Sequence, residues 1–201
     1  TTPLTPDENA TPREKFAGMV RYADHLIGRL VGGLDELGLR QKTLVLITAD
    51  NGTDNGTDQG QEQSLGGRID GHISGEGIYS LTERGINVPF VVSCPAWIPQ
   101  GRESDALINA ADILPTLADL AGAELPRDVT IDGRSFAPVL RDGDDRGWTR
   151  PWTFTQYGTT RTVRDQRFKW YSTGQFFDLA GDPLEQHDLM VMGGVESLDP
   201  E

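Results

Sequence analysis

The sequence of 201 residues contains one cysteine, three lysines and no long apolar run. The single Cys94 permits no internal disulfide, which leaves the redox compartment open. No stretch approaches the roughly 18 apolar residues of a membrane span, and the N-terminus lacks the residue order of a signal peptide. Lys and Arg together number 18 against 31 Asp and Glu, a net charge of −13. Because a phosphate backbone is bound by clustered cations, this balance argues against nucleic acid as the main partner.

Length and composition indicate one domain of ordinary size, or one domain with a small appendage. The 24 glycines and 12 prolines are typical of a chain with many tight loops. The chain starts at Thr1 without a methionine, and its first twelve residues are mostly polar and contain proline. We therefore expect it to be a mature or excised part of a longer protein.

The segment TLVLITADNG, residues 43–52, carries the clearest functional pattern. Its apolar and β-branched residues run directly into Asp50, Asn51 and Gly52. Such a run is typical of a buried strand in a parallel sheet, and open α/β folds bind ligands where these strands end. The neighbouring oxygens of Asp50 and Asn51 suit a hard cation. An Asx-type turn is the alternative interpretation, and the residues alone leave both open.

A long helix is predicted before this strand, over residues 11–38. Thr11 and Glu14 fit a capping box with proline at the first helical position, and apolar residues then recur every three or four positions. Glycine is unfavourable inside a helix. Close packing of this helix against the sheet is therefore predicted from three glycines within it, Gly28, Gly32 and Gly33.

Residues 50–84 are polar and glycine-rich, which predicts a long surface loop of the kind that often carries function. Residues 88–94 predict a second buried strand, and residues 107–108 a short third one. A helix is expected over residues 113–121, with Asp112 as its cap.

The composition changes near residue 126, where short extended segments replace the helical period. Four aromatic-rich segments predict a small antiparallel sheet, at residues 152–157, 161–164, 167–171 and 175–179. The predicted division is therefore residues 1–125 and 126–201. A set of aromatics is interpreted as the core of this sheet, with a carbohydrate-stacking surface as the alternative: Trp148, Trp152, Phe154, Trp170, Tyr171, Phe176 and Phe177.

Several blocks in order, over roughly residues 16–189, together resemble one family. They are FAGMVRYADHLIGRLVGGLDELGL, TLVLITADNG, ERGINVPFVVSCP, DILPTLADLAG, DGRSFAPVL and FFDLAGDPLEQHDL. They are similar to blocks of the arylsulfatase-type sulfatases, in the alkaline-phosphatase-like superfamily. The strand block matches that family's strand ending in an Asp-Asn metal pair, and the last block its closing Y-D-L-x-x-D-P-x-E-x-x-N-L.

The resemblance implies an α/β fold, with an alkaline-phosphatase-like sheet segment flanked by helices and a small C-terminal antiparallel sheet. It implies hydrolysis of sulfate monoesters, with Asp50 and Asn51 holding Ca²⁺ or Mg²⁺ together with upstream carboxylates. The partners implied are a sulfated small molecule or glycan and the remainder of the sulfatase domain. A periplasmic or extracellular location is also implied, although the residues themselves leave the compartment open.

The resemblance covers only the C-terminal part of such an enzyme. The family's nucleophile is a formylglycine made from Cys or Ser in C/S-x-P-x-R, a motif that this sequence does not contain. Cys94-Pro95-Ala96 is superficially similar, but no arginine follows at the required place, and Cys94 is interpreted as a buried apolar residue. We therefore expect the nucleophile upstream and the isolated 201 residues to be inactive.

One departure from the family concerns positive charge in the glycine-rich loop. The family places a sulfate-contacting lysine about five residues before the acid of its E-G-G segment, where this chain has Ile78 before Glu83. Arg68 and Arg84 are the candidates to supply the missing charge. His72 is a candidate acid, base or sulfate donor, because imidazole titrates near neutrality.

The sequence leaves two rival functions open. One is a hydrolase of phosphate or phosphonate esters in the same superfamily, which an upstream Thr or unmodified Ser would indicate. The other is a non-catalytic sulfate- or glycan-binding relative, which the missing lysine favours.

Overall fold

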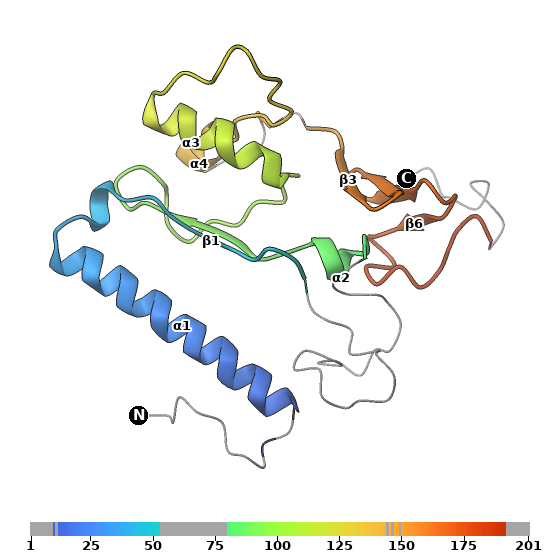
Figure 1. The fold of residues 1–201 in the computed structure, drawn as a ribbon, viewed down its shortest axis with the longest axis horizontal. Coiled ribbons are helices and arrows are strands. Elements are labelled where there is room, and N and C mark those ends of the chain that lie inside the picture. Colours follow the sequence, from blue (N-terminus) through green and yellow to red (C-terminus); the bar gives the residue numbers. More distant parts are fainter. Residues whose placement is uncertain are drawn as a thin grey trace.

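The computed structural model describes residues 10, 12–52, 80–143, 145, 147–148 and 150–191. The main elements are a long helix, a two-stranded sheet, a pair of helices and a four-stranded sheet, and Figure 1 shows their arrangement. The elements in order are α1 (Pro12–Glu36), η1 (Arg40–Lys42), β1 (Val45–Thr48), α2 (Glu83–Ile86), β2 (Phe90–Ser93), η2 (Ala110–Asp112), α3 (Ile113–Ala121), α4 (Ala137–Asp142), β3 (Thr153–Tyr157), β4 (Thr160–Arg164), β5 (Phe168–Tyr171) and β6 (Phe176–Asp178).

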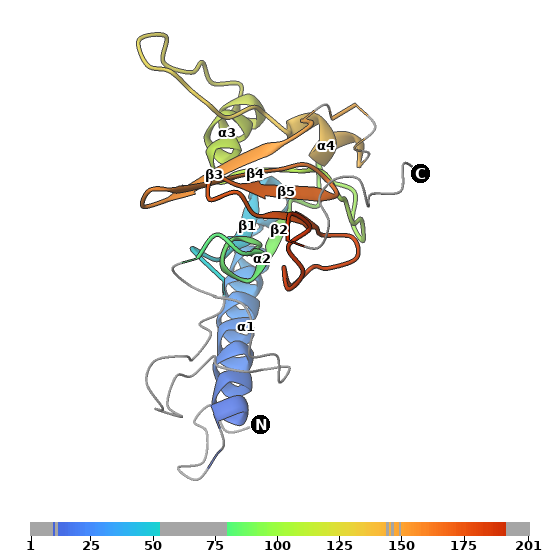
Figure 2. The same cartoon turned by 90° about the vertical axis from the view of Figure 1, so that its right-hand side faces the viewer.

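The predicted long helix is confirmed as α1, but the described residues do not provide the close packing that was predicted for its glycines. A Cβ atom built on Gly28, Gly32 or Gly33 would meet no described atom within 4 Å, and Leu30 is 58% exposed. Figure 2 shows α1 pointing away from both sheets. The helical period identifies an apolar face but not what covers it. No helix in the described part of the chain is long and apolar enough to cross a membrane.

The strands predicted around residues 43–48 and 88–94 form β1 and β2, but they pair antiparallel, with Val45 opposite Ser93 and Thr48 opposite Phe90. The prediction of a parallel, fully buried strand was therefore wrong for this pair. An apolar run indicates burial and carries no information about the direction of the neighbouring strand. Cys94 follows β2 with 1% exposure, as predicted for a buried structural cysteine, and its thiol donates to the Gln41 carbonyl.

The predicted helix at residues 113–121 is confirmed as α3, which ends at Gly122 with φ of 66°. Asp112 stands at the N-cap position of α3 as predicted, but its side chain makes no capping hydrogen bond to that helix. It caps η2 together with Asn109 instead, because the Asn109 side chain accepts from Ala111 while Asp112 accepts from the Asn109 N–H. The short third strand predicted at residues 107–108 does not form in the described structure.

Asp112 is fully buried at the start of α3. Its carboxylate accepts from the backbone N–H of Arg134 at 2.7 Å and pairs with the guanidinium of Arg150. These contacts tie α3 to two segments that lie far along the chain. A buried carboxylate is tolerated here because Arg150 matches its charge and both of its oxygens accept hydrogen bonds.

We expect Asp112→Asn to destabilise the full-length protein by about 3 kcal/mol, since it leaves the nearly buried Arg150 without its counter-charge. Glu124→Gln is the matched control, because Glu124 and Arg127 form an ion pair with both side chains over 80% exposed. That change should cost less than about 1 kcal/mol. Urea unfolding of both variants measures the difference, and equal losses would contradict the assignment.

The predicted small antiparallel sheet is confirmed, with strand order β3-β4-β5-β6. Consecutive strands pair throughout, as in Thr153 opposite Arg164 and Trp170 opposite Phe176. The Arg167 guanidinium binds Asp178 on β6 and holds the pKa of that carboxyl below its ordinary value. The division of the chain at residue 125 stays a prediction.

The prediction that the aromatics form the core of this sheet is wrong for several of them. Tyr171 and Phe177 are buried on one face, at 7% and 6% exposure, while Trp152, Phe154 and Trp170 on the other face are 44–57% exposed. Successive side chains of a strand point to opposite faces, so aromatics at neighbouring positions separate. The buried face is the one that contacts the rest of the chain, through a cluster of Leu81, Tyr171, Phe177 and Leu179.

Candidate functional site

The candidate site begins where β1 ends. Thr48 is the last strand residue, and Asp50, Asn51 and Gly52 follow it directly. Asp50 is exposed and Asn51 partly buried. The N–H of Asn51 donates to Asp50 Oδ1 at 2.9 Å, whereas the N–H of Gly52, which an Asx turn would direct to Asp50, donates to the Gly85 carbonyl instead. The carboxylate and the neighbouring amide therefore lie at one strand end.

The short helix α2 lies directly against this turn. The N–H of Gly52 donates to the carbonyl of Gly85 at 2.8 Å. A Cβ atom on Gly52 would lie 1.7 Å from the carbonyl oxygen of Arg84, far inside van der Waals contact. Only glycine permits such an approach of two backbones. The position of Asp50 and Asn51 is thus set by α2 as well as by β1.

These residues fit a hard cation as part of its ligand set. Carboxylate and amide oxygens are the donors that Ca²⁺ and Mg²⁺ prefer, and Asp50 and Asn51 provide two of the six or more that Ca²⁺ takes. The described residues contain no group of three or more His, Cys, Asp or Glu arranged to hold a metal.

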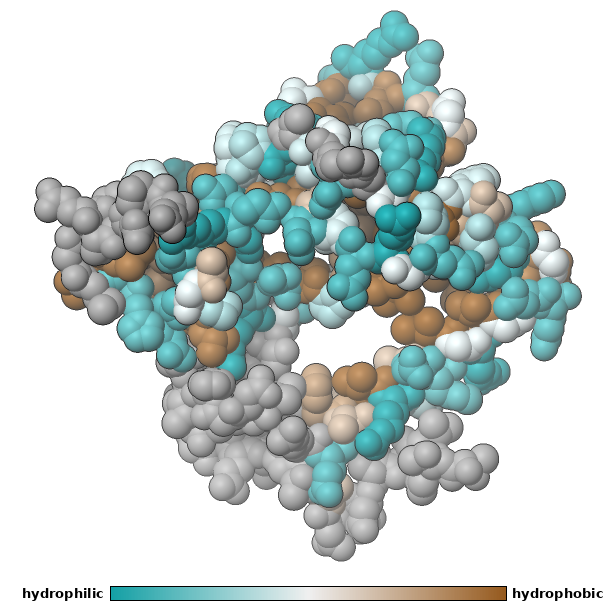
Figure 3. Space-filling model, turned by 180° about the vertical axis from the view of Figure 1, so that it is seen from behind, coloured by the Kyte–Doolittle hydropathy of each residue, from teal (hydrophilic) through white to brown (hydrophobic). Residues whose placement is uncertain are grey.

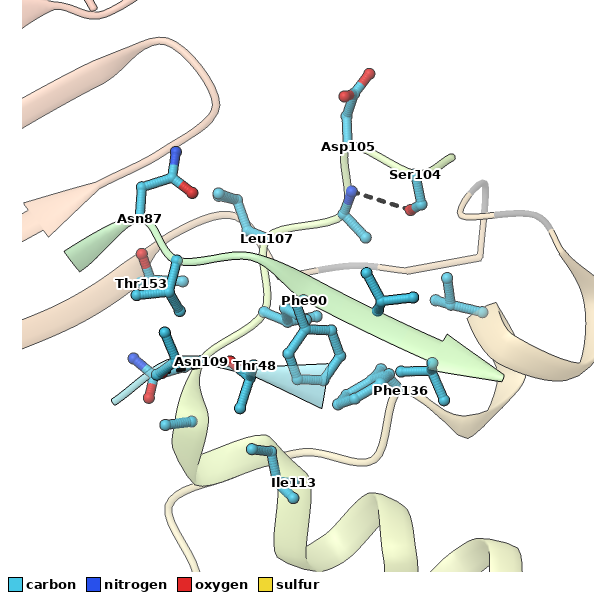
Figure 4. Close-up of a pocket in the computed structure, with 18 of the residues that line it drawn as sticks. Thr48, Asn87, Phe90, Ser104, Asp105, Leu107, Asn109, Ile113, Phe136 and Thr153 are labelled. Atoms are coloured by element: carbon cyan, nitrogen blue, oxygen red, sulfur yellow. Dashed lines mark hydrogen bonds between the residues drawn. The ribbon is translucent and has the colours of Figure 1, made fainter. Parts of the chain in front are cut away.

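A large hollow opens beside the site. Asp50 and Asn51 are among its lining residues, and its volume of about 1810 Å³ exceeds that of an ordinary ligand pocket. Phe90 and Phe136 pack edge to face within it at 5.7 Å between ring centroids, near Leu107 and Ile113 (Figure 4). Figure 3 shows hydrophobic side chains along the border of an opening in the described structure. We assign no ligand to this hollow because it is too wide to define one and its lining mixes polar and apolar residues throughout.

The remaining predicted site residues divide into two groups. Arg84 lies on α2, partly buried, where its carbonyl oxygen faces the Gly52 turn. Arg68, His72 and Ile78 lie outside the described residues. The backbone of Arg84 thus lies against Gly52, two residues after Asp50, and the proposed roles of Arg84, Arg68 and His72 stay predictions.

An ion-pair network behind α2 was missed in the sequence. Lys169 on β5 has 0% exposure, and its ammonium lies 3.0 Å from Glu83 Oε1 and 2.9 Å from Glu185 Oε1. Arg164 on β4 binds the second oxygen of Glu83 at 2.5 Å. Tyr171 donates to Glu185 and lies 3.1 Å from the Leu81 carbonyl. One signal was available in the sequence: Lys169 lies two residues before Tyr171 in the same strand, so the two side chains share a face, and burial of the tyrosine implies burial of the lysine.

The architecture matches that of solved sulfatases. One solved protein, in complex with its substrate D-glucosamine-2-N,6-O-disulfate, superposes with a TM-score of 0.71 at 25% identity, covering 91% of this chain and 36% of its own. A 2-O GAG sulfatase superposes with a TM-score of 0.65 at 26% identity, covering 89% and 39%. Fold and strand-end site thus define an alkaline-phosphatase-like α/β unit with an appended antiparallel sheet.

The particular family follows from two family models. The sulfatase model matches residues 1–123, and the model described as N-sulphoglucosamine sulphohydrolase, C-terminal, matches residues 79–199. The chain belongs to the sulfatase family. This confirms the resemblance seen in the sequence blocks.

Named relatives agree with that membership. The chain is 37% identical to steryl-sulfatase of Mus musculus over 131 residues, which are 65% of this chain and 21% of that protein. It is 36% identical to arylsulfatase A of Homo sapiens, over 64% of this chain and 24% of that protein. With arylsulfatase K of Xenopus laevis it shares 24% identity over 92% of this chain and 35% of that protein. The chain thus spans between about a fifth and a third of these relatives.

Proposed function

We propose that this chain is the C-terminal part of a sulfatase that hydrolyses sulfate monoesters of aryl compounds or carbohydrates. The observation that carries the proposal is the Asp50-Asn51 pair at the end of β1, held against α2 at Gly52. Membership of the sulfatase family supports it, as do relatives named steryl-sulfatase and arylsulfatase A. A sulfated carbohydrate is supported further by the solved protein whose substrate is D-glucosamine-2-N,6-O-disulfate.

In this proposal Asp50 and Asn51 hold a divalent cation, Ca²⁺ or Mg²⁺, with carboxylates from the remainder of the domain. A cation bound there would draw charge from the sulfate oxygens and so ease cleavage of the S–O bond. The contribution of this chain is to supply two oxygen ligands and to orient them through β1 and α2. The location of the protein, periplasmic or extracellular, is part of the same proposal.

The nucleophile belongs to another part of the protein in this proposal. A formylglycine there would supply the nucleophilic oxygen, while this chain contributes Asp50 and Asn51 and the loop that follows them. Arg68 and Arg84 supply positive charge to the sulfate in place of the family lysine, and His72 moves a proton to or from the substrate. For Arg84, the support is that its backbone on α2 lies against Gly52, in the turn that carries Asp50.

The proposal is tested with the full-length protein and three substrates: an aryl sulfate, the matching aryl phosphate and D-glucosamine-6-sulfate. We expect turnover of a sulfate ester that stops after chelation and returns with Ca²⁺ or Mg²⁺. Preference for the aryl phosphate would instead establish the phosphatase alternative. Calorimetric binding of a sulfated sugar without any turnover would establish the non-catalytic relative, which the replacement of a lysine by Ile78 favours.

A further inference from the structure

We infer that the buried ion-pair network of the C-terminal sheet is a positioning device for the cation site at Asp50. Through Glu83 it holds α2, and α2 in turn holds the Gly52 turn. The inference rests on the proposed cation site and adds that its affinity depends on the sheet. Lys169, Arg164, Glu83 and Glu185 are then positioning residues, which act on the cation site through α2.

The network fixes Glu83 in place from two strands. Lys169 binds one oxygen of its carboxylate and Arg164 the other, so the group is held at both ends. Lys169 has no exposure, and the Glu83 side chain is 11% exposed. A buried ammonium is tolerated only where its charge is matched, and here two carboxylates match it. These contacts therefore permit little movement of Glu83.

The side chain of Glu185 binds the backbone of the same helix. Its carboxylate, 2% exposed, accepts from the N–H of Glu83 at 2.6 Å and from Lys169 at 2.9 Å. Its own backbone has φ of 57°, the sole positive value for a non-glycine residue in the described structure. That conformation is unfavourable for a residue with a Cβ atom and persists where surrounding contacts impose it. The chain thus accepts local strain to bring this carboxylate to the start of α2.

α2 is short enough to transmit this positioning directly. It consists of four residues, Glu83–Ile86, so the bound Glu83 and the carbonyl of Gly85 belong to one helical turn. That carbonyl accepts from Gly52, two residues after Asp50. Ile86 packs against the apolar cluster of the sheet, so both ends of α2 contact the same neighbour. A displacement of Glu83 must therefore move Gly85 and the turn that carries Asp50.

The competing explanation is a brace that stabilises the sheet without affecting the site. The chain offers a matched pair of variants to separate the two. Arg164→Gln removes a guanidinium that binds Glu83 on α2, whereas Arg167→Gln removes one that binds Asp178 within the sheet. Both changes break one ion pair made by an arginine of the same sheet, with Arg164 18% and Arg167 41% exposed. Only the first acts on α2.

The experiment uses the full-length protein stripped of metal and titrated with Ca²⁺ by calorimetry. We expect Arg164→Gln and Lys169→Met each to weaken Ca²⁺ binding about 10-fold, the size typical for residues that orient a metal ligand. Arg164→Lys should retain most of the affinity, and Arg167→Gln should match the unmodified protein. Hydrogen exchange of the peptide containing Gly52 should quicken in the first two variants only.

The inference is overturned if Arg164→Gln and Arg167→Gln lower the melting temperature alike and both leave Ca²⁺ affinity within about twofold. Should Lys169→Met not fold, the Arg164 variants decide the question alone. Asp50→Ala tests the cation site separately from the positioning role of the network. If Asp50→Ala leaves Ca²⁺ binding intact, the cation site itself is wrong. If Asp50→Ala weakens Ca²⁺ binding but Arg164→Gln does not, only the positioning role is rejected.

Discussion

Replacing Asp50 with alanine is expected to weaken Ca²⁺ binding by the full-length protein by about 100-fold or more. Substitution of a residue that only orients a metal ligand typically lowers metal affinity or activity 10- to 100-fold. Removal of a charged ligand should lower the affinity by at least the upper end of that range. The loss should appear both in calorimetric titration of metal-free protein and in kcat/KM for a sulfate ester. Raising Ca²⁺ should restore part of the activity, because the site keeps Asn51.

Asp35→Ala is the matched control for this change. Asp35 is an exposed residue of α1, so its substitution removes the same charge at a distance from the site. We expect unchanged Ca²⁺ affinity and unchanged kcat/KM in this variant. If both variants lose affinity equally, the effect is one of net charge, and Asp50 is no ligand.

Gly52→Ala is expected to lower kcat/KM by about 100-fold although it removes no ligand. The added Cβ would lie 1.7 Å from the Arg84 carbonyl oxygen and 2.7 Å from its carbon, so either α2 or the turn must move. The obstacle is backbone, which cannot swing aside as a long side chain could. A shift of about 1 Å near a reacting centre can cost 10²-fold.

Gly28→Ala provides the control for that substitution. Gly28 lies within α1, where a new Cβ meets no described atom within 4 Å. Alanine is favoured over glycine in a helix by about 1 kcal/mol, so this variant should be equally or more stable and fully active. Steady-state kinetics and Ca²⁺ titration of the two variants measure the contrast. Activity of Gly52→Ala equal to that of Gly28→Ala would contradict the close approach of α2.

Much of the secondary structure could be predicted because its signals are local. The periodicity of residues 12–36 predicts α1, and alternating aromatics separated by turns predict β3 to β6 with nearly correct bounds. The ordered sequence blocks also identified the sulfatase family, which the family models confirm. The Asp50-Asn51 pair stands out for the same reason, as two oxygen donors directly after an apolar strand.

Other features were out of reach because they depend on residues distant in the chain. The antiparallel pairing of β1 with β2 joins segments more than 40 residues apart, and neither segment encodes the direction of its neighbour. The exposure of Trp170 beside buried Lys169 depends on which face of the sheet contacts Leu81 and Glu83. Local pattern reports which residues share a face, while the packing partner decides which face is inside.

The strand end at Asp50 illustrates both contributions. The order of residues 43–52 by itself determined a strand, a turn and two adjacent oxygen donors. Only the tertiary structure placed α2 on Gly52 and joined α2 to Lys169 and Glu185, over 80 residues further along the chain. The physical reason is that hydrogen bonds and ion pairs depend on distances of about 3 Å, which spacing along the sequence does not specify for residues so far apart.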